Sequence, residues 1–441
     1  MEKLLSHLHS GINAQARADA APPVSPYRWV IAAVLFAGVI SAFFDRISIS
    51  VLFTNVEFQN AMGTGFDPAR LGLLMTAFLF AYGVSSIALS FVGDLFGPRR
   101  CLTVGALAWG GFMALMGAAG SFGGMLAYRV LLGLSEGPQF SLTALLTKRW
   151  FPSRERARAT SLWMVGSPLG SMLGFPLTIH LMTAYGWRAS FYLLAAINVF
   201  LILPLVVVFI RDRPETAPFK LEGREAPLAF RSSVVLFMMD WRFWMIVLAT
   251  CGSLVYLWGL NSWLPSYLVR VRHFDPRQTS IFASLPFLCM FLGEILGAVI
   301  ADRTGRSALV SAVSLFLCGF IMYFVPSAPD AYGAALLISA STFFWGACTT
   351  SKNALGLNIL PTGAVATGVG LYNGIGNLVG ALSPFVMGIL IGKTENFEAG
   401  FLVIVASAIL GSCALLPLAF AATAERDMPA VMATAPSGES A

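Results

Sequence analysis

Long apolar runs separated by short polar loops recur along the whole chain of 441 residues. Each run is about 18–25 residues long, which as a helix crosses roughly 30 Å of hydrocarbon at 1.5 Å per residue. An open strand edge in lipid would leave backbone groups unpaired, so we expect every run to be a helix. The sequence therefore predicts an all-α membrane protein with twelve transmembrane helices, at residues 29–53, 71–92, 101–120, 124–147, 160–183, 189–210, 242–268, 279–300, 308–326, 331–351, 364–391 and 399–422.

The composition excludes most other classes of protein. Hydrophobic residues make up 57% of the chain and charged residues only 11%, whereas a soluble domain is about 25% charged. The net charge of +6 comes from residues scattered over many loops, so it predicts no nucleic-acid partner. The six cysteines form no CxxC or Cys/His set, which predicts neither a metal site nor a disulfide framework. No catalytic triad, nucleotide loop or folded extramembrane domain is visible, so we expect no enzyme and no cofactor.

The loop charges predict the orientation. With the N-terminus inside, cytoplasmic segments hold 19 Lys and Arg residues and outside segments hold 6, which places both termini in the cytoplasm. We read no cleavable signal peptide before the first run. The predicted parts are an N-terminal tail (1–28), a six-helix half (29–210), a cytoplasmic linker (211–240), a second six-helix half (241–422) and a disordered C-terminal tail (423–441).

The two halves share a loop motif at equivalent positions. Asp94-Leu-Phe-Gly97-Pro-Arg99-Arg100 lies between the second and third runs, and Asp302-Arg303-Thr-Gly305-Arg306 lies between the eighth and ninth. In both loops a Gly follows the Asp by three positions and an Arg comes soon after. Duplicated halves of this kind place a substrate site between them, near the middle of the membrane.

In the first half, four charged residues stand inside apolar runs: Asp45, Arg46, Arg129 and Glu136. A charge at the bilayer centre costs about 2.5–3.5 kcal/mol on insertion scales, so such residues normally face a bundle interior or a wet cavity. Two arginines and two carboxylates in one half indicate a path that holds an anion and passes protons.

The chain resembles the major facilitator superfamily, and within it the anion:cation symporter branch of galactonate and glucarate permeases and of sialic-acid and vesicular glutamate transporters. The matching segments are FFDRISISV (43–51), AYGVSS (81–86), GDLFGPRR (93–100), YRVLLGLSEGPQFS (128–141), KRWFPSRERARATS (148–161), GWRASFY (186–192) and YNGIGNLVGALSP (372–384). The resemblance covers about residues 27–422. It implies two pseudo-symmetric halves, secondary proton-coupled carriage of organic anions, and a protein that works as a monomer.

Arg46 is the first candidate for the substrate carboxylate, because the planar guanidinium matches a carboxylate in two bonds. The alternatives are a structural pair with a nearby carboxylate, or a side chain that reaches the outer surface. Asp45 is a candidate proton site, since burial favours the neutral form of a carboxyl group. Its alternative is a charge partner for an arginine such as Arg129.

Arg129 and Glu136 are seven residues apart, about two helical turns along one face. Gln139, a further substrate-binding candidate, and Thr143 continue the polar face. The resemblance implies proton coupling for Glu136, and leaves Arg129 open between a substrate contact and a gating ion pair. Tyr82 is a substrate-binding candidate in the second run, with a structural tyrosine as the alternative.

In the second half, Asn373 and Asn377 lie one turn apart, where their amides could bind substrate hydroxyls or join helices. Asn261 is a further substrate-binding candidate. The resemblance assigns the loop residues to conformational gating between the halves; they are Asp94, Arg99, Arg100, Asp302 and Arg306. The glutamate carriers of the branch have an arginine in the seventh span, and this chain has none at 243–269, which favours a monocarboxylate with hydroxyls.

The sequence therefore predicts a multi-pass carrier of a bacterial-type inner membrane that imports a small organic anion with protons. A sugar acid such as an aldonate or aldarate, or a related carboxylate, fits the pattern. The partners are this anion, protons and the lipid bilayer, and the proton gradient supplies the energy. The alternative within transport is a facilitator or antiporter for a drug or an aromatic acid.

Overall fold

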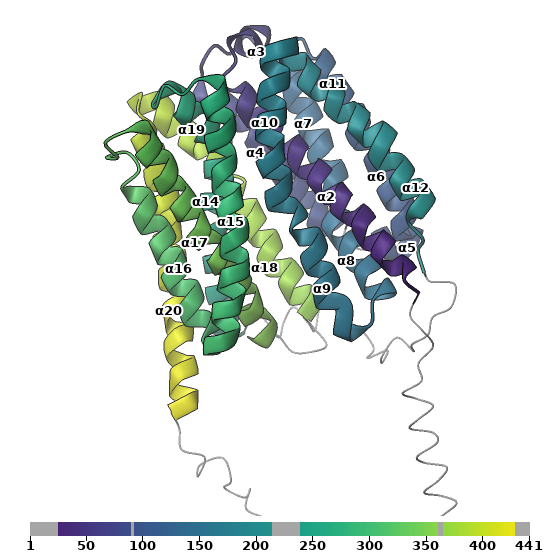
Figure 1. Ribbon diagram of the computed structural model, residues 1–441, viewed down its shortest axis with the longest axis vertical. Coiled ribbons are helices and arrows are strands. Elements are labelled where there is room, and N and C mark those ends of the chain that lie inside the picture. Colours follow the sequence, from purple (N-terminus) through teal and green to yellow (C-terminus); the bar gives the residue numbers. More distant parts are fainter. Residues whose placement is uncertain (1–24, 90–91, 214–238, 360–364, 428–441) are drawn as a thin grey trace, which may run out of the picture.

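Two bundles of helices stand side by side in the computed structural model of the chain (Figure 1). The structure describes residues 25–89, 92–213, 239–359 and 365–427. The N-terminal bundle contains α2 (Tyr27–Leu52), α3 (Val56–Ala61), α4 (Pro68–Ala88), α5 (Val92–Phe96), α6 (Pro98–Ala118), α7 (Phe122–Glu136), α8 (Gln139–Trp150), α9 (Ser153–Met164), α10 (Gly166–Tyr185), α11 (Trp187–Ile197), the π-helix η1 (Asn198–Ile202) and α12 (Leu203–Phe209). The C-terminal bundle contains α14 (Trp241–Arg270), α15 (Pro276–Thr304), α16 (Ser307–Tyr323), α17 (Ala331–Ile359), α18 (Val365–Gly380), α19 (Ser383–Thr394) and α20 (Phe397–Asp427).

The all-α prediction is confirmed for the described residues, where no strand occurs. Ten helical segments of this part of the chain are long and apolar enough to cross a membrane. The predicted run 308–326 coincides with α16, which has only 17 residues. The predicted run 124–147 is divided between α7 and α8 at Gly137 and Pro138. The number of crossings and the side on which the termini lie stay predictions.

The predicted division into two halves, a linker and two tails stays a prediction, and much of the linker and of the tails lies outside the described residues. This applies to residues 1–24 of the N-terminal tail, 214–238 of the linker and 428–441 of the C-terminal tail. Helix α20 continues past the predicted end of the last run at 422 and reaches Asp427.

The duplicated loops have a shared backbone feature. Gly97 before α6 has a φ of 84°, and Gly305 before α16 has a φ of 61°. Side chains with a Cβ are disfavoured in this region of φ, and glycine adopts it readily. The Gly that follows each Asp by three positions therefore turns the chain at the same point of each half.

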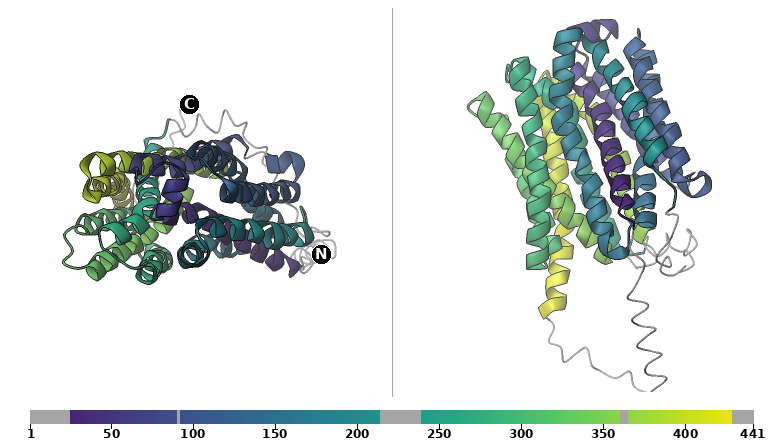
Figure 2. Two further views of the ribbon diagram at one scale, coloured as in Figure 1. Left: turned by 90° about the horizontal axis from the view of Figure 1, so that it is seen from above. Right: turned by 45° about the vertical axis from the view of Figure 1, so that its right-hand side comes forward.

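The two halves pack against each other along several seams. One seam joins α4 to α18 and α19, a second joins α10 to α15, and α2 also packs on α14; Figure 2 shows the two groups of helices from above. At the end of the molecule where α3 lies, Gly72 packs directly on the backbone of Pro384, and Gly388 packs on the backbone of Pro68. The Phe385 N–H also donates to Thr76 Oγ1 at 3.2 Å. The halves are thus closed against each other at this end, the predicted outer side.

Candidate functional site

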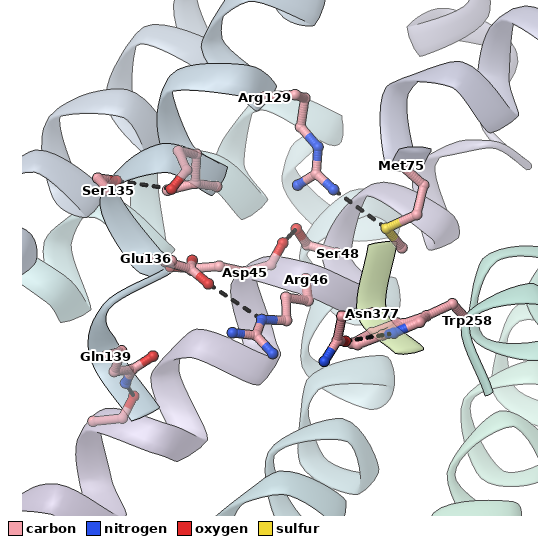
Figure 3. A network of polar contacts seen from close by, with 12 residues as sticks. Asp45, Arg46, Ser48, Met75, Arg129, Ser135, Glu136, Gln139, Trp258 and Asn377 are labelled. Carbon is pink, nitrogen blue, oxygen red and sulfur yellow. Dashed lines mark hydrogen bonds and ion pairs between the residues drawn. The ribbon is translucent and has the colours of Figure 1, made fainter. Parts of the chain in front are cut away.

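Arg46 and Glu136 form an ion pair in the interior of the N-terminal bundle. Arg46 Nε of α2 donates to Glu136 Oε2 of α7 at 3.2 Å, and both side chains are buried. Figure 3 shows the pair at the centre of a group of polar side chains. The structure thus realises one alternative left open for Arg46, a pair with a nearby carboxylate, while its role in substrate binding stays a prediction.

A break in the helix places Glu136 at this point. Glu136 is the last residue of α7, and α8 begins after Gly137 and Pro138. Proline has no N–H, so the carbonyl of Leu134 cannot receive the usual helical hydrogen bond from position 138. The hydroxyl of Ser85 on α4 donates to this carbonyl instead, at 2.5 Å. The neighbouring helix therefore stabilises the break.

Aromatic rings surround the Arg46 guanidinium. Its carbon lies 4.4 Å from the centre of the Tyr82 ring and 4.8 Å from that of Phe43. Phe140 and Phe78 follow at 5.7 and 5.9 Å. Ring faces attract a cation and keep water from it. Tyr82 is thus beside Arg46, and its role in substrate binding stays a prediction.

Asp45 is adjacent to Arg46 in sequence but has a different partner. Its Oδ2 accepts a hydrogen bond from Asn198 Nδ2 at 3.0 Å, and Ser41 Oγ donates to Asn198 Oδ1 at 2.9 Å. Adjacent residues of a helix point about 100° apart. The Arg46 side chain therefore reaches Glu136 on α7, whereas the Asp45 side chain reaches Asn198 on η1. Sequence reasoning missed Asn198; its signal was a lone amide within the apolar run 189–210.

Arg129 lies two turns before Glu136 and contacts α4. Its Nε donates to the carbonyl of Leu74 at 3.2 Å, and its guanidinium lies 4.5 Å from the centre of the Phe78 ring. Nη2 contacts the sulfur of Met75 at 3.4 Å. Phe78 thus lies near both arginines, and the two cations share one aromatic environment.

Each of the four charged side chains retains a buried polar atom without a partner in the described part of the chain. These atoms are Asp45 Oδ1, Arg46 Nη2, Arg129 Nη1 and Glu136 Oε1. Two of them are donors and two are acceptors. Because an unpaired buried polar atom is costly, the cluster can accept a further anion at its donors and a proton at its acceptors.

The remaining polar candidates are distributed over both halves. Gln139 points into the N-terminal bundle, where its Nε2 donates to the carbonyl of Gly38 at 3.0 Å. Asn377 accepts from Trp258 Nε1 at 3.3 Å and donates to the carbonyl of Asn373 at 2.9 Å. Asn261 is buried on α14, and its Oδ1 has no partner in the described residues. Trp258 and Asn377 belong to the C-terminal bundle and lie on the side of the Arg46–Glu136 pair that faces this bundle (Figure 3).

The predicted gating residues do not join the halves in the described part of the structure. The backbone N–H of Arg99 donates to Asp212 Oδ1 at 2.8 Å, and Arg99 Nη2 donates to the carbonyl of Val207 at 2.6 Å. Both partners belong to the N-terminal half. Arg100, Asp302 and Arg306 are exposed. The side chain of Asp94 lies outside the described residues, so the gating role stays a prediction.

Two further charged residues of the spans are in the C-terminal half. Lys352 on α17 is 3% exposed, and Glu294 on α15 is partly buried beside Gly346. The sequence signal for Glu294 was a charge inside the apolar run 279–300, and that for Lys352 was a charge directly after the run 331–351. No group of three or more His, Cys, Asp or Glu side chains in the described residues is arranged to hold a metal ion.

Comparison with known proteins identifies the family. Residues 34–384 match the sequence pattern of the Major Facilitator Superfamily. The chain belongs to this superfamily. Members of the superfamily are membrane transporters, so this carrier is a multi-pass membrane protein and not an enzyme.

Several bacterial transporters are similar over nearly the full length of this superfamily member. A probable sulfoacetate transporter of Cupriavidus necator is 31% identical, with 89% of this chain and 93% of the relative covered. A hexuronate transporter of Bacillus subtilis is 24% identical, with 88% and 93% covered. A probable L-galactonate transporter of Escherichia coli is 24% identical, with 84% of each covered. Bacterial relatives of this kind lie in the inner membrane.

Solved structures show the same fold. A bacterial homologue of the human lysosomal transporter Spinster, in an inward-facing and occupied conformation, has a TM-score of 0.72 at 17% identity, with 91% of this chain and 97% of that chain covered. The unoccupied form has a TM-score of 0.70 at 16% identity, with 90% and 95% covered. This likeness establishes the fold of the carrier and nothing about its substrate.

Proposed function

We propose that this carrier is a proton-coupled symporter of a small organic anion that works by alternating access. The observation that carries the proposal is the buried cluster of two arginines and two carboxylates with an unpartnered donor on each arginine. Arg46 is the group that would receive the carboxylate of the substrate, because its guanidinium retains a free donor inside an aromatic enclosure. Arg129 has a free donor as well.

Charge balance supports the coupling to protons. The cluster is neutral when Asp45 and Glu136 are ionised and both arginines are charged. An incoming monoanion would leave one uncompensated negative charge in a buried site, where the effective dielectric constant is low. One proton on Glu136 or Asp45 restores neutrality, and a proton on Glu136 also frees Arg46 from its carboxylate partner. The anion and the proton therefore bind together more favourably than either does alone.

The substrate class follows from the chemistry of the site and from the relatives. The relatives carry sulfoacetate, hexuronate and galactonate by name, all small organic anions. Amides at Asn261 and Asn377 could receive hydroxyl groups from the C-terminal side. We therefore propose a sugar acid such as an aldonate or aldarate, or a related small carboxylate. The proton gradient supplies the energy without a cofactor, and one chain provides both halves of the site.

Purified protein in proteoliposomes tests the proposal. A panel of sugar acids and small carboxylates is first screened for increased thermal stability, since a ligand of the folded state stabilises it. The ligand so found is then offered with an inward-directed proton gradient. Accumulation against its own gradient, with matching alkalinisation outside, is expected. Uptake that only equilibrates the substrate, without proton movement, would instead support a facilitator of an aromatic acid or drug.

A further inference from the structure

A small cavity lies inside the N-terminal bundle, on the side of the ion-pair cluster that leads to the N-terminal end of α2. Its volume is about 10 Å³, which is on the order of the room that one water molecule needs. Its walls come from α2, α6, α8, η1 and α12. All of these belong to one half, so the cavity is separate from the seams between the halves.

Two polar atoms among the residues that line this cavity have no partner in the described residues. They are Trp109 Nε1, a donor, and Gln139 Oε1, an acceptor. Both side chains are 2% exposed. The other end of the Gln139 amide is fixed by its bond to the carbonyl of Gly38. A single water could accept from Trp109 and donate to Gln139, and would thereby satisfy both atoms.

Polar groups continue from Asp45 toward this cavity. Asp45 is bonded to Asn198, and Asn198 to Ser41, one turn before Asp45 on α2. Gly38, three residues before Ser41, lines the cavity. Asn198 begins the π-helix η1, whose last residue, Ile202, also lines it. A π-helix is wider than an α-helix and is often found at functional positions.

We propose that this cavity binds a water molecule and marks the route by which protons pass between Asp45 and the predicted cytoplasmic side, through the interior of the N-terminal bundle. The proposal rests on the proposed function, because it needs a carrier that moves protons. It separates the two cargoes: the anion passes between the halves, and the proton passes within one half.

The proton step changes only O–H bonds. The carboxyl group of Asp45 gives its proton to a water that enters the polar column, and the water at the cavity end passes a proton on to the cytoplasm. The carboxylate is left behind, where the charged groups that act on it are Glu136, Arg129 and Arg46. No oxidant or reductant takes part.

Two substitutions test the route from different sides. Trp109→Phe removes the N–H donor and keeps the ring. Gly38→Ala removes no polar group; its Cβ would lie 3.7 Å from Gln139 Nε2, an ordinary contact, and would occupy part of the cavity. Gly111→Ala is the matched control, since a Cβ there meets nothing within 4 Å. Proton-driven net uptake should fall about tenfold in the first two variants, because Trp109→Phe removes one hydrogen bond to the water and Gly38→Ala reduces the room for it. Substrate exchange at equal pH should be unchanged in all three.

A second measurement reads the water directly. The resonance Raman difference between the wild-type protein and Trp109→Phe isolates the indole N–H of Trp109. A hydrogen-bonded frequency supports the water, and a free N–H overturns it. A bonded N–H together with normal proton-driven uptake in both variants overturns the route. If the wild-type protein moves no protons at all, the proposed function is wrong and the proton route is wrong with it. The Raman measurement then still shows whether the cavity holds a water molecule.

Discussion

Arg46 Nε lies 3.2 Å from Glu136 Oε2, and the two residues are 90 positions apart in the chain. The pair joins α2 to the end of α7. Any anion that binds Arg46 must compete with this carboxylate, and any proton that reaches Glu136 weakens its hold on the arginine. Substrate affinity and proton binding are therefore linked through one contact.

Glu136→Gln tests this linkage by fixing the neutral form of the side chain. We expect the variant to exchange labelled substrate across proteoliposome membranes but to lose accumulation driven by a proton gradient, because no proton is needed or released at position 136. Glu57→Gln, at an exposed site on α3, is the control. A Glu136→Gln protein that still concentrates substrate when only the pH gradient is applied would show that the coupling lies elsewhere.

Arg46 is tested by two replacements. Arg46→Lys keeps the charge but loses the planar fork, so we expect clearly weaker binding. Arg46→Ala should cost about 2–5 kcal/mol of binding free energy, as for other buried charged partners. Titration calorimetry with the ligand from the stability screen measures both. Arg70→Lys, at an exposed position on α4, controls for the loss of an arginine. Equal affinity in the alanine variant and the wild-type protein would remove Arg46 from the binding site.

Gly72→Ala should open the seam at the predicted outer end. A Cβ at this position would collide with the carbonyl of Pro384, and overpacking of this kind costs about 1–3 kcal/mol. The closed arrangement should therefore lose population to the arrangement open at that end. The readout is thiol labelling from outside at Thr76→Cys, in a background without the native cysteines. Gly111→Ala is the control, and equal labelling in both would refute the seam.

Asp212→Ala should weaken the start of α6. The Asp212 carboxylate accepts from the backbone N–H of Arg99, and so caps a helix whose N-cap residue, Gly97, has no side chain to do so. Loss of a cap costs about 1 kcal/mol. Thermal unfolding in detergent should occur at a lower temperature. Asp212→Asn keeps an acceptor oxygen and should lose less; identical unfolding of all three proteins would contradict this role.

The helical architecture could be predicted from the sequence because hydrocarbon thickness and backbone pairing leave few choices for a chain of apolar runs. Arg46 and Glu136 were recognisable for the same reason, since a charge in such a run needs a partner. The hydrogen bond between Asp45 and Asn198 could not be predicted. The two residues are 153 positions apart in the chain, and only the packing of α2 against η1 brings them together. The break between α7 and α8 was hidden as well. Pro138 was visible in the sequence, but the contact from Ser85 that stabilises the break is tertiary.

The aromatic packing at the predicted outer end has an electrical consequence. Phe53 of the N-terminal half packs on Trp263 of the C-terminal half with ring centres 5.7 Å apart, and Trp263 packs on Phe397 at 6.2 Å. Hydrated ions cannot cross a seam filled by such rings, since dehydration in an apolar constriction is very costly. In this conformation the layer of rings therefore blocks the leakage of ions through the seam at the predicted outer end.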